Sequence, residues 1–379
     1  MRTKPYRVIV WGPGGVGRAC LRQLIDRKDC EIVGVLAYTA AKNGRDVGEL
    51  IGHAPIGVRV TTNKEDIFGL DADAVLYSGM LPFDVPSMES DIIRLLESGK
   101  HVVSAVAFHF AHNHGAAYVE KFAAACRKGK SCLHGTGENP GFWFERVAMT
   151  LTGVCTQVEH LQLDEYADLS TSGSTPELLA AISFGETAEN AAKPGPMDAL
   201  WKEYYFVEIL NMASISLFGR PLDRVEHKPQ HYIAERDVEL SRANGDPIDM
   251  RIPQGRVYAM SHVFTGFLEE RKRLGIGVNW FLRRRNSPFQ IQSEHTWRIN
   301  LEGKPVSLRC DIGAYASLTG DSEFHAGDPT TSTYYITAVN MIQAIPVLCA
   351  HQPGIVYASV FATSSEDLRN LEGRTRLGE

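Results

Sequence analysis

The stretch Tyr6-Arg-Val-Ile-Val-Trp-Gly-Pro-Gly-Gly-Val-Gly17 decides the fold of this chain. The β-branched run Tyr6–Trp11 predicts a strand, and the apolar spacing from Val16 to Arg27 predicts a helix. The glycines between them follow the pattern G-x-G-x-x-G, which is typical of dinucleotide-binding loops when it joins a strand to a helix. We therefore expect the chain to begin with a nucleotide-binding fold.

Each glycine of this loop has a physical task. Gly12 permits a tight turn, Gly14 lets a pyrophosphate approach the backbone, and Gly17 lets the helix pack closely on the strand. The helix N-terminus faces the anion. A plain strand–helix turn is the alternative. The residues expected to bind the cofactor here are Gly12, Pro13, Gly14, Gly15, Val16 and Gly17.

Strand and helix patterns alternate through the first 140 or so residues. This order predicts parallel strands joined by crossover helices, which means a doubly wound sheet of the Rossmann type. Further apolar runs that predict strands are Glu31–Ala37, Ala72–Ser78, His101–Ala107 and Ser131–His134, and the helix candidates are Val85–Ser98 and Ala116–Lys128.

The pattern changes after Phe142. Longer runs in which apolar and polar residues alternate predict a mostly antiparallel sheet in a C-terminal α+β domain. We expect a Rossmann domain at residues 1–142, an α+β substrate and dimerisation domain at 143–330, and a helix at 331–350 that packs back on the first domain. The runs are Val158–Asp164, Asp237–Leu240, Gly255–Ser261, His295–Asn300 and Val306–Cys310.

Composition excludes several classes of protein. The net charge of -6 over 379 residues leaves no basic excess for nucleic acid. Seven cysteines without a C-x-x-C pair indicate reduced thiols in a cytoplasmic protein. No apolar stretch is expected to reach the length of a membrane span.

The end of the second predicted strand bears on the choice of cofactor. Proteins that bind NAD usually carry an acid there for the ribose hydroxyls. The segment Leu36–Arg45 contains no carboxylate, and Tyr38, Thr39 and Lys42 are placed to contact the ribose or a 2′-phosphate. The cofactor is therefore NADP or NAD, with the balance toward NADP. The alternative is that Lys42 and Arg45 are solvated loop charges.

Four stretches carry a resemblance to a known family. They are Val8–Gly17, Arg45–Leu50, His134-Gly-Thr-Gly-Glu-Asn-Pro-Gly-Phe142, and Asn340–Pro346 with Gln352–Val356. On these the chain resembles the dihydrodipicolinate-reductase-like oxidoreductases, in the branch of 2,4-diaminopentanoate dehydrogenase and the native amine dehydrogenases.

The resemblance implies a function. Members of this branch use a nicotinamide cofactor for reversible reductive amination of a ketone or aldehyde, and they pair as homodimers through the second sheet. We expect an NAD(P)-dependent oxidoreductase that transfers hydride between the cofactor and a carbonyl, imine or amine carbon. One alternative is a ketone, aldehyde or imine reductase that uses no ammonia. Another is a non-catalytic dinucleotide-binding protein.

The chain departs from the branch at one position. The amine dehydrogenases follow the strand equivalent to His101–Ala107 with a catalytic glutamate, whereas this chain has Ala107 and Phe108. Two replacements are open: Glu138, where the family usually has an aliphatic residue, and His109. His109 begins an H-x-x-H-x-H run that fits no standard zinc site, so we expect no metal.

The remaining candidates surround these two. The resemblance and the strand ends place Ser78 and Gly79 by the cofactor, with Met80 and Leu81 close. Further cofactor contacts are Gly135, Thr136 and Asn139, and candidate substrate contacts are Phe108, Phe142, Tyr166 and Asp168. The alternative for the last four is a role in the core or at a surface strand end.

Overall fold

The structure is a computed structural model. It describes residues 4–79, 84–171, 174, 176–241, 248–291, 293, 295–315, 317–319 and 330–357. Met80, Leu81 and the polar tail after Thr363 lie outside the described residues. The chain forms two compact units: the first is Met1–Gly141 with Tyr334–Ala358, and the second is Phe142–Thr333 with Ser359–Glu379.

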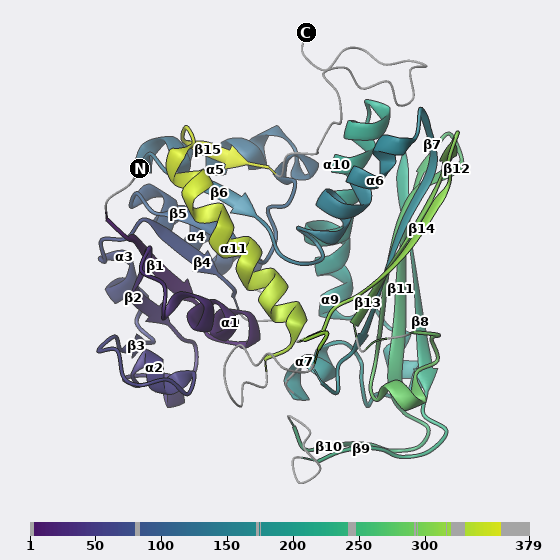
Figure 1. Ribbon diagram of the computed structural model, residues 1–379, viewed down its shortest axis with the longest axis horizontal. Coiled ribbons are helices and arrows are strands. Elements are labelled where there is room, and N and C mark those ends of the chain that lie inside the picture. The colour runs from purple at the N-terminus through teal and green to yellow at the C-terminus, as the bar shows by residue number, and fades with distance from the viewer. Residues whose placement is uncertain are drawn as a thin grey trace. The chain divides into compact units, whose positions relative to one another are not determined.

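The first unit is built on a seven-stranded sheet in which the described pairings are all parallel. Strand order is β15-β6-β5-β4-β1-β2-β3, so the chain winds outward in both directions from β1 and β4 (Figure 1). This order confirms the predicted doubly wound sheet. The strands are β1 (Tyr6–Trp11), β2 (Cys30–Leu36), β3 (Val60–Thr61), β4 (Ala74–Tyr77), β5 (His101–Ser104), β6 (Cys132–Gly135) and β15 (Gly354–Val356).

Helices cover this sheet because each has one apolar side. Helices α1 (Gly15–Leu24) and α11 (Ser332–Ala350) bury Ala19, Leu21, Met341 and Ile345 against Val8 and its neighbours in one core. The other helical segments are η1 (Ala40–Lys42), α2 (Val47–Leu50), α3 (Lys64–Phe68), α4 (Val85–Glu97), η2 (Ala111–His114) and α5 (Ala116–Gly129).

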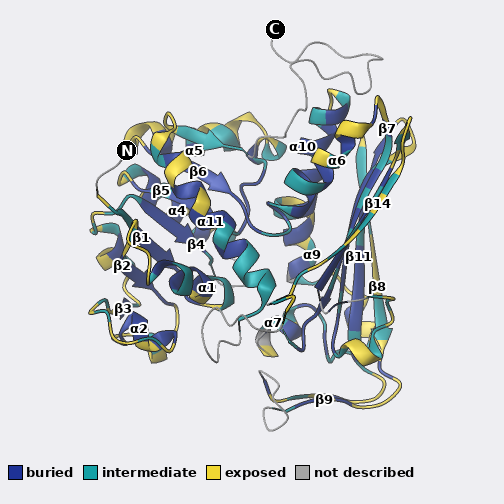
Figure 2. Cartoon of the chain, viewed as in Figure 1, coloured by how far each residue is buried: buried dark blue, intermediate teal, exposed yellow. Residues whose placement is uncertain are grey.

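Helix α11 corrects one expectation from the sequence. With 19 residues and a mean hydropathy of 1.3, it is long and apolar enough to cross a membrane by length and composition. Its residues Ala338, Met341 and Ile345 are fully buried in the core of the first unit. Burial of these residues is typical of a core helix, and Figure 2 shows buried, intermediate and exposed residues along α11.

The second unit is built on a six-stranded sheet of order β14-β13-β7-β12-β11-β8. Only the β7–β12 pairing is parallel, which confirms a mostly antiparallel sheet. Two strands were not predicted, β8 and β12, because both begin with charged or polar residues. The strands are β7 (Gln157–Asp168), β8 (Arg224–Ile233), β11 (Val257–Leu268), β12 (Arg271–Phe281), β13 (His295–Lys304) and β14 (Leu308–Gly313), with the separate pair β9 (Val238–Leu240) and β10 (Met250–Ile252).

Helices of the second unit include two π-helical segments. The apolar α10 (Phe206–Phe218) buries Phe206, Ile209 and Leu217, and α9 (Pro196–Leu200) leads into it through a π-helical segment. The others are the π-helix η3 (Trp143–Ala148), α6 (Met149–Leu151), η4 (Thr152–Val154), α7 (Pro176–Ala181), α8 (Ala188–Ala191), the π-helix η5 (Trp201–Tyr205) and η7 (Arg284–Asn286).

Candidate functional site

The predicted cofactor residues of the first unit follow strands that all run in one direction. Their carboxyl ends therefore meet at one edge of the sheet, where α/β proteins bind ligands. The backbone N–H of Ser78, after β4, donates to the carbonyl oxygen of Trp11 at 2.9 Å. The Ser78 hydroxyl donates to the carbonyl oxygen of Gly12 at 2.8 Å. These bonds join β1 and β4 at the point where the strand order reverses.

Two positions of the glycine loop require glycine, because of backbone conformation and close packing. Gly12 has a φ of +91°, and a Cβ there would lie 2.3 Å from the carbonyl oxygen of Ser78. A Cβ at Gly17 would lie 2.2 Å from the carbonyl oxygen of Gly12, so the helix packs directly on the turn. At Gly14, in contrast, a Cβ would meet nothing within 4 Å. The protein needs Gly12 and Gly17 for its own packing, whereas Gly14 faces open space.

This open space lies at the N-terminus of α1. The N-cap residue of α1 is Gly14, which has no side chain to cap the helix. Uncapped N–H groups and the helix dipole favour an anion. Gly15 has no room for a side chain because a Cβ would lie 2.5 Å from the ring of Tyr334. The loop from Gly12 to Gly17, with Pro13 and Val16, thus fits the pyrophosphate of a dinucleotide.

The segment after β2 folds onto the glycine loop. Lys42 Nζ donates to the carbonyl oxygen of Pro13 at 2.9 Å, and the Trp11 indole N–H donates to the hydroxyl of Tyr38 at 2.8 Å. Thr39 precedes η1 in the same segment. Burial, followed by the charges of Arg18 and Arg45, lowers the pKa of Lys42. Arg18 and Arg45 therefore add positive charge near Lys42 at this end of the loop.

The first carboxylate after β2 belongs to Asp46. Its Oδ1 accepts the backbone N–H groups of Gly48 at 2.8 Å and Ile56 at 3.0 Å, and its Oδ2 accepts that of Gly57 at 2.8 Å. These hydrogen bonds lower the pKa of Asp46 and tie it to the start of α2. The Asp46 carboxylate therefore accepts hydrogen bonds from the backbone and is not free to bind the ribose hydroxyls.

The second glycine turn, after β6, is folded tightly on itself. The N–H of Thr136 donates to the carbonyl oxygen of Ser104 on β5 at 2.9 Å. A Cβ at Gly135 would lie 2.4 Å from the backbone of Phe108, and one at Gly141 would lie 2.0 Å from the nitrogen of Gly137. Glycine is thus required where backbone meets backbone.

Glu138 and Asn139 are half-buried at this turn. They share the ligand-binding edge with the glycine loop, since β6 and β1 belong to one parallel sheet. Gly79 follows Ser78 at the same edge. Catalytic use of Glu138 stays a prediction.

The side chain of His109 is buried, and burial, with the nearby His134, lowers its pKa to about 3. A proton-transfer group operating at neutral pH works best with a pKa near that pH. The use of His109 as a proton-transfer group stays a prediction.

Phe108 is 1% exposed, and its ring lies 4.8 Å, edge-on, from that of Phe122 and 6.3 Å from that of Tyr118, both on α5. These contacts place the ring in the core of the first unit, and its role as a substrate contact stays a prediction. Ala107 and Phe108 both have positive φ, of 60° and 65°, so the segment that bears the family glutamate is a tight turn here.

Asp168, in the second unit, is hydrogen-bonded to the backbone of two segments. Its Oδ1 accepts from the N–H of Ser170 at 2.9 Å and of Arg283 at 3.0 Å, and its Oδ2 accepts from the N–H of Arg284 at 2.7 Å. The buried carboxylate thus holds two loops together. Tyr166 packs edge-on against Phe289, with ring centroids 5.5 Å apart.

Phe142, the first residue of the second unit, packs edge-on against Trp143, with ring centroids 4.9 Å apart.

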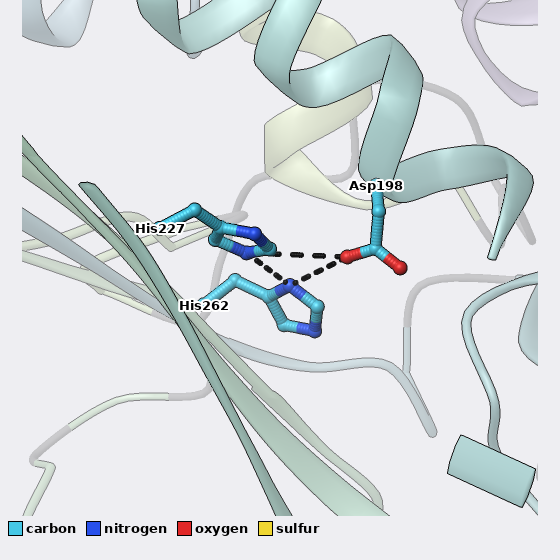
Figure 3. A group of neighbouring side chains, drawn as sticks. All are labelled: Asp198, His227 and His262. Carbon is cyan, nitrogen blue, oxygen red and sulfur yellow. Dashed lines mark hydrogen bonds and ion pairs between the residues drawn. The ribbon is translucent and has the colours of Figure 1, made fainter. Parts of the chain in front are cut away.

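One group of candidate site residues was missed by sequence reasoning. Asp198, His227 and His262 of the second unit converge, as Figure 3 shows. They are 29 and 35 residues apart and form no short motif, so only the pairing of β8 with β11 brings the histidines together.

The sheet, its point of reversal and its glycine loop define the first unit as a dinucleotide-binding domain of the Rossmann class. Residues 6–106 match the family described as dihydrodipicolinate reductase, N-terminus.

Two curated relatives extend this match. An amine dehydrogenase of Streptomyces virginiae is 27% identical over 182 residues, which are 47% of this chain and 50% of the relative. A 4-hydroxy-tetrahydrodipicolinate reductase of Desulfitobacterium hafniense is 44% identical over 59 residues, 15% of this chain and 21% of the relative. The chain thus spans half or less of the length of these relatives. It is related to both, which confirms the resemblance read from its motifs.

Solved structures show the same fold. The structure of amine dehydrogenase from Mycobacterium smegmatis matches with a TM-score of 0.72 at 18% identity, covering 94% of this chain and 97% of that one. At this identity the likeness establishes the two-domain architecture alone.

Proposed function

We propose that the protein is an NAD(P)-dependent oxidoreductase that transfers hydride between a nicotinamide nucleotide and a carbonyl, imine or amine carbon. The observation that carries the proposal is Gly14, which faces open space in front of an uncapped helix at the reversal point of the sheet. The relatives named amine dehydrogenase and reductase support the same chemistry. A bound nicotinamide would supply the hydride, and the protein would bind and orient the reactants.

The preferred nucleotide is NADP(H). Arg18 and Arg45 lie near enough to Lys42, beside the glycine loop, to lower its pKa, and Asp46 is occupied by backbone N–H groups. A 2′-phosphate would meet positive charge there and no available carboxylate. Steady-state turnover with NADPH and NADH tests this preference directly, and equal kcat/KM values would contradict it.

The reaction proposed first is the reductive amination implied by the resemblance, with Glu138 orienting the amine or moving its proton. A second candidate is favoured by a specific observation. Ala107 and Phe108 are buried, non-ionisable residues where the branch has its glutamate. A site without that acid suits reduction of a preformed carbonyl or imine.

An ammonia-dependence assay separates the two reactions. A panel of ketones and aldehydes is incubated with NADPH, with and without ammonium, and amine and alcohol products are measured by mass spectrometry. Amine formation that requires ammonium supports the first candidate. Alcohol formation that does not depend on ammonium supports the carbonyl or imine reductase and contradicts reductive amination. Nucleotide binding without turnover, both with and without ammonium, would indicate a non-catalytic protein and contradict both proposed reactions.

Assembly into a homodimer through the second sheet is part of the proposal. Light scattering after size-exclusion chromatography would show twice the chain mass of 41.9 kDa if it is correct, and the single-chain mass if it is not.

A further inference from the structure

We propose that Asp198, His227 and His262 form a binding site for a divalent transition-metal ion of the zinc class, separate from the nucleotide site. The three side chains come from α9, β8 and β11 of the second unit, and their potential ligand atoms all lie within 4.8 Å of one another (Figure 3).

The register of two strands creates the site. In the antiparallel pair β8–β11, His227 lies opposite Phe264 and His262 lies opposite Pro229. Residues two apart on a strand share a face, so His227 and His262 are diagonal neighbours on one face of the sheet. Helix α9 places Asp198 against the same two rings.

The distances between the ligand atoms fit a metal ion. His227 Nε2 is 2.9 Å from His262 Nδ1, and Asp198 Oδ1 is 3.4 Å from His262 Nδ1 and 3.9 Å from His227 Nε2. Ligands about 2.0–2.1 Å from Zn²⁺ in a tetrahedron lie about 3.3 Å from one another. The three observed distances of 2.9, 3.4 and 3.9 Å lie on both sides of this value, so small side-chain movements suffice to bind the ion.

The chemistry of the donor set favours the zinc class. Two imidazole nitrogens and one carboxylate suit Zn²⁺, Co²⁺ or Fe²⁺, whereas Mg²⁺ and Ca²⁺ prefer oxygen ligands. At most one proton lies between the two facing nitrogens, which are 2.9 Å apart. On binding, the ion takes the place of that proton, which moves to the other nitrogen of the same ring, so that both histidines bind as neutral imidazoles.

The ligands are held before any ion arrives. Asp198 Oδ2 accepts the backbone N–H of Gly195 at 2.7 Å, which directs Oδ1 toward the histidines. Among the described residues, Oδ1 receives no hydrogen bond of ordinary geometry. The His227 ring stacks on Phe264 with centroids 4.3 Å apart, and His262 meets Trp201 edge-on at 4.9 Å. The side chains of His227 and His262 are only 6% and 5% exposed.

A cavity gives access to the site. It has a volume of about 430 Å³, and both His227 and Phe264 line it. Three protein ligands leave a fourth position on zinc for water or a small ligand. Lys202 and Arg224 also line the cavity and favour an anionic ligand. Lys202 is exposed, so solvent screens its repulsion of the ion.

Metal binding to untagged, chelator-treated protein tests the proposal. Isothermal titration with Zn²⁺ is expected to give one site per chain, and titration with Mg²⁺ no heat above dilution. The variants Asp198→Asn, His227→Gln and His262→Gln are each expected to weaken Zn²⁺ binding at least tenfold. His160→Gln, at a half-buried histidine on β7 outside the cluster, is the control and should bind as the parent does.

Two further measurements keep the test decisive. Titration of the parent with Co²⁺ should produce the visible absorption bands of a low-coordinate nitrogen–oxygen site, a result that needs no variant. NADPH binding, followed by fluorescence, should be unchanged in all variants, which separates this site from the nucleotide site. The proposal is overturned if the parent binds no stoichiometric Zn²⁺, or if folded cluster variants bind it as tightly as the parent.

Discussion

Lys42 Nζ donates a hydrogen bond to the carbonyl oxygen of Pro13, 2.9 Å away, and so links the end of β2 to the glycine loop. This bond places an ammonium group where the adenosine ribose of a dinucleotide would lie. Lys42 is the residue predicted to bind the phosphate, and this hydrogen bond gives it a second role, which is to order the glycine loop.

Lys42→Met is expected to raise the KM for NADPH roughly tenfold while changing the KM for NADH much less, since a charge-assisted contact to a 2′-phosphate is lost. Steady-state kinetics with both nucleotides measure the ratio. The exposed Lys28→Met is the control. Equal weakening of both nucleotides would mean that Lys42 acts only by ordering the loop.

Gly14→Ala and Gly17→Ala should separate cofactor binding from packing. A Cβ at Gly14 meets nothing within 4 Å, so the melting temperature should stay unchanged while NADPH binding weakens. A Cβ at Gly17 lies 2.2 Å from the Gly12 carbonyl oxygen, and overpacking should cost about 1–3 kcal/mol of unfolding free energy. Thermal unfolding and fluorescence titration check both. Normal NADPH affinity in Gly14→Ala would refute the assigned pyrophosphate site.

Glu138→Gln is expected to lower kcat roughly 100-fold if its carboxylate moves a proton in the reaction. The amide keeps the size of the side chain, so NADPH affinity should not change. A pH–rate profile should lose one limb in the variant. The exposed Glu31→Gln serves as control. Unchanged kcat and an unchanged profile would remove Glu138 from the chemistry.

Asp168→Ala should destabilise the second unit. The backbone N–H groups of Ser170, Arg283 and Arg284 would lose their acceptor, and we expect a loss of about 2–4 kcal/mol. Urea unfolding measures it. The exposed Asp71→Ala should change little. A stable Asp168→Ala protein with impaired turnover would restore the substrate-binding role instead.

His109 should make stability depend on pH. Its pKa is about 3 when folded and near 6.5 in the unfolded chain. Below about pH 6.5 the unfolded chain binds a proton that the folded protein does not, so this contribution to stability falls as the pH decreases toward 3. The slope is about 1.4 kcal/mol per pH unit for one group.

Urea unfolding between pH 7 and 5 measures this effect in His109→Gln, which should show a shallower loss of stability than the parent. The exposed His351→Gln should keep the parent slope. Identical slopes in His109→Gln and the parent would show that His109 titrates normally in the folded protein.

The sequence by itself determined the first unit. Strand and helix periods alternate from Tyr6 to Gly135, and the glycine pattern lies at the one turn where backbone must approach an anion. These signals are local, because they depend on neighbours within one strand–turn–helix unit. The matching family segment, residues 6–106, covers the same region. In the second unit, β8 escaped prediction because charged and polar side chains interrupt its apolar alternation, and β12 escaped because it begins with three charged residues.

Only the tertiary structure decided what the polar residues do. Asp168 looks available in the sequence, yet backbone N–H groups of Arg283 and Arg284, far along the chain, occupy its carboxylate. His109 looks like a proton-transfer group, yet burial keeps it neutral. The cluster of Asp198, His227 and His262 exists only because the register of β8 with β11 aligns two histidines and α9 adds a carboxylate. Hydrogen-bond partners, solvent exposure and strand register depend on residues far apart in the chain, and no short motif encodes them.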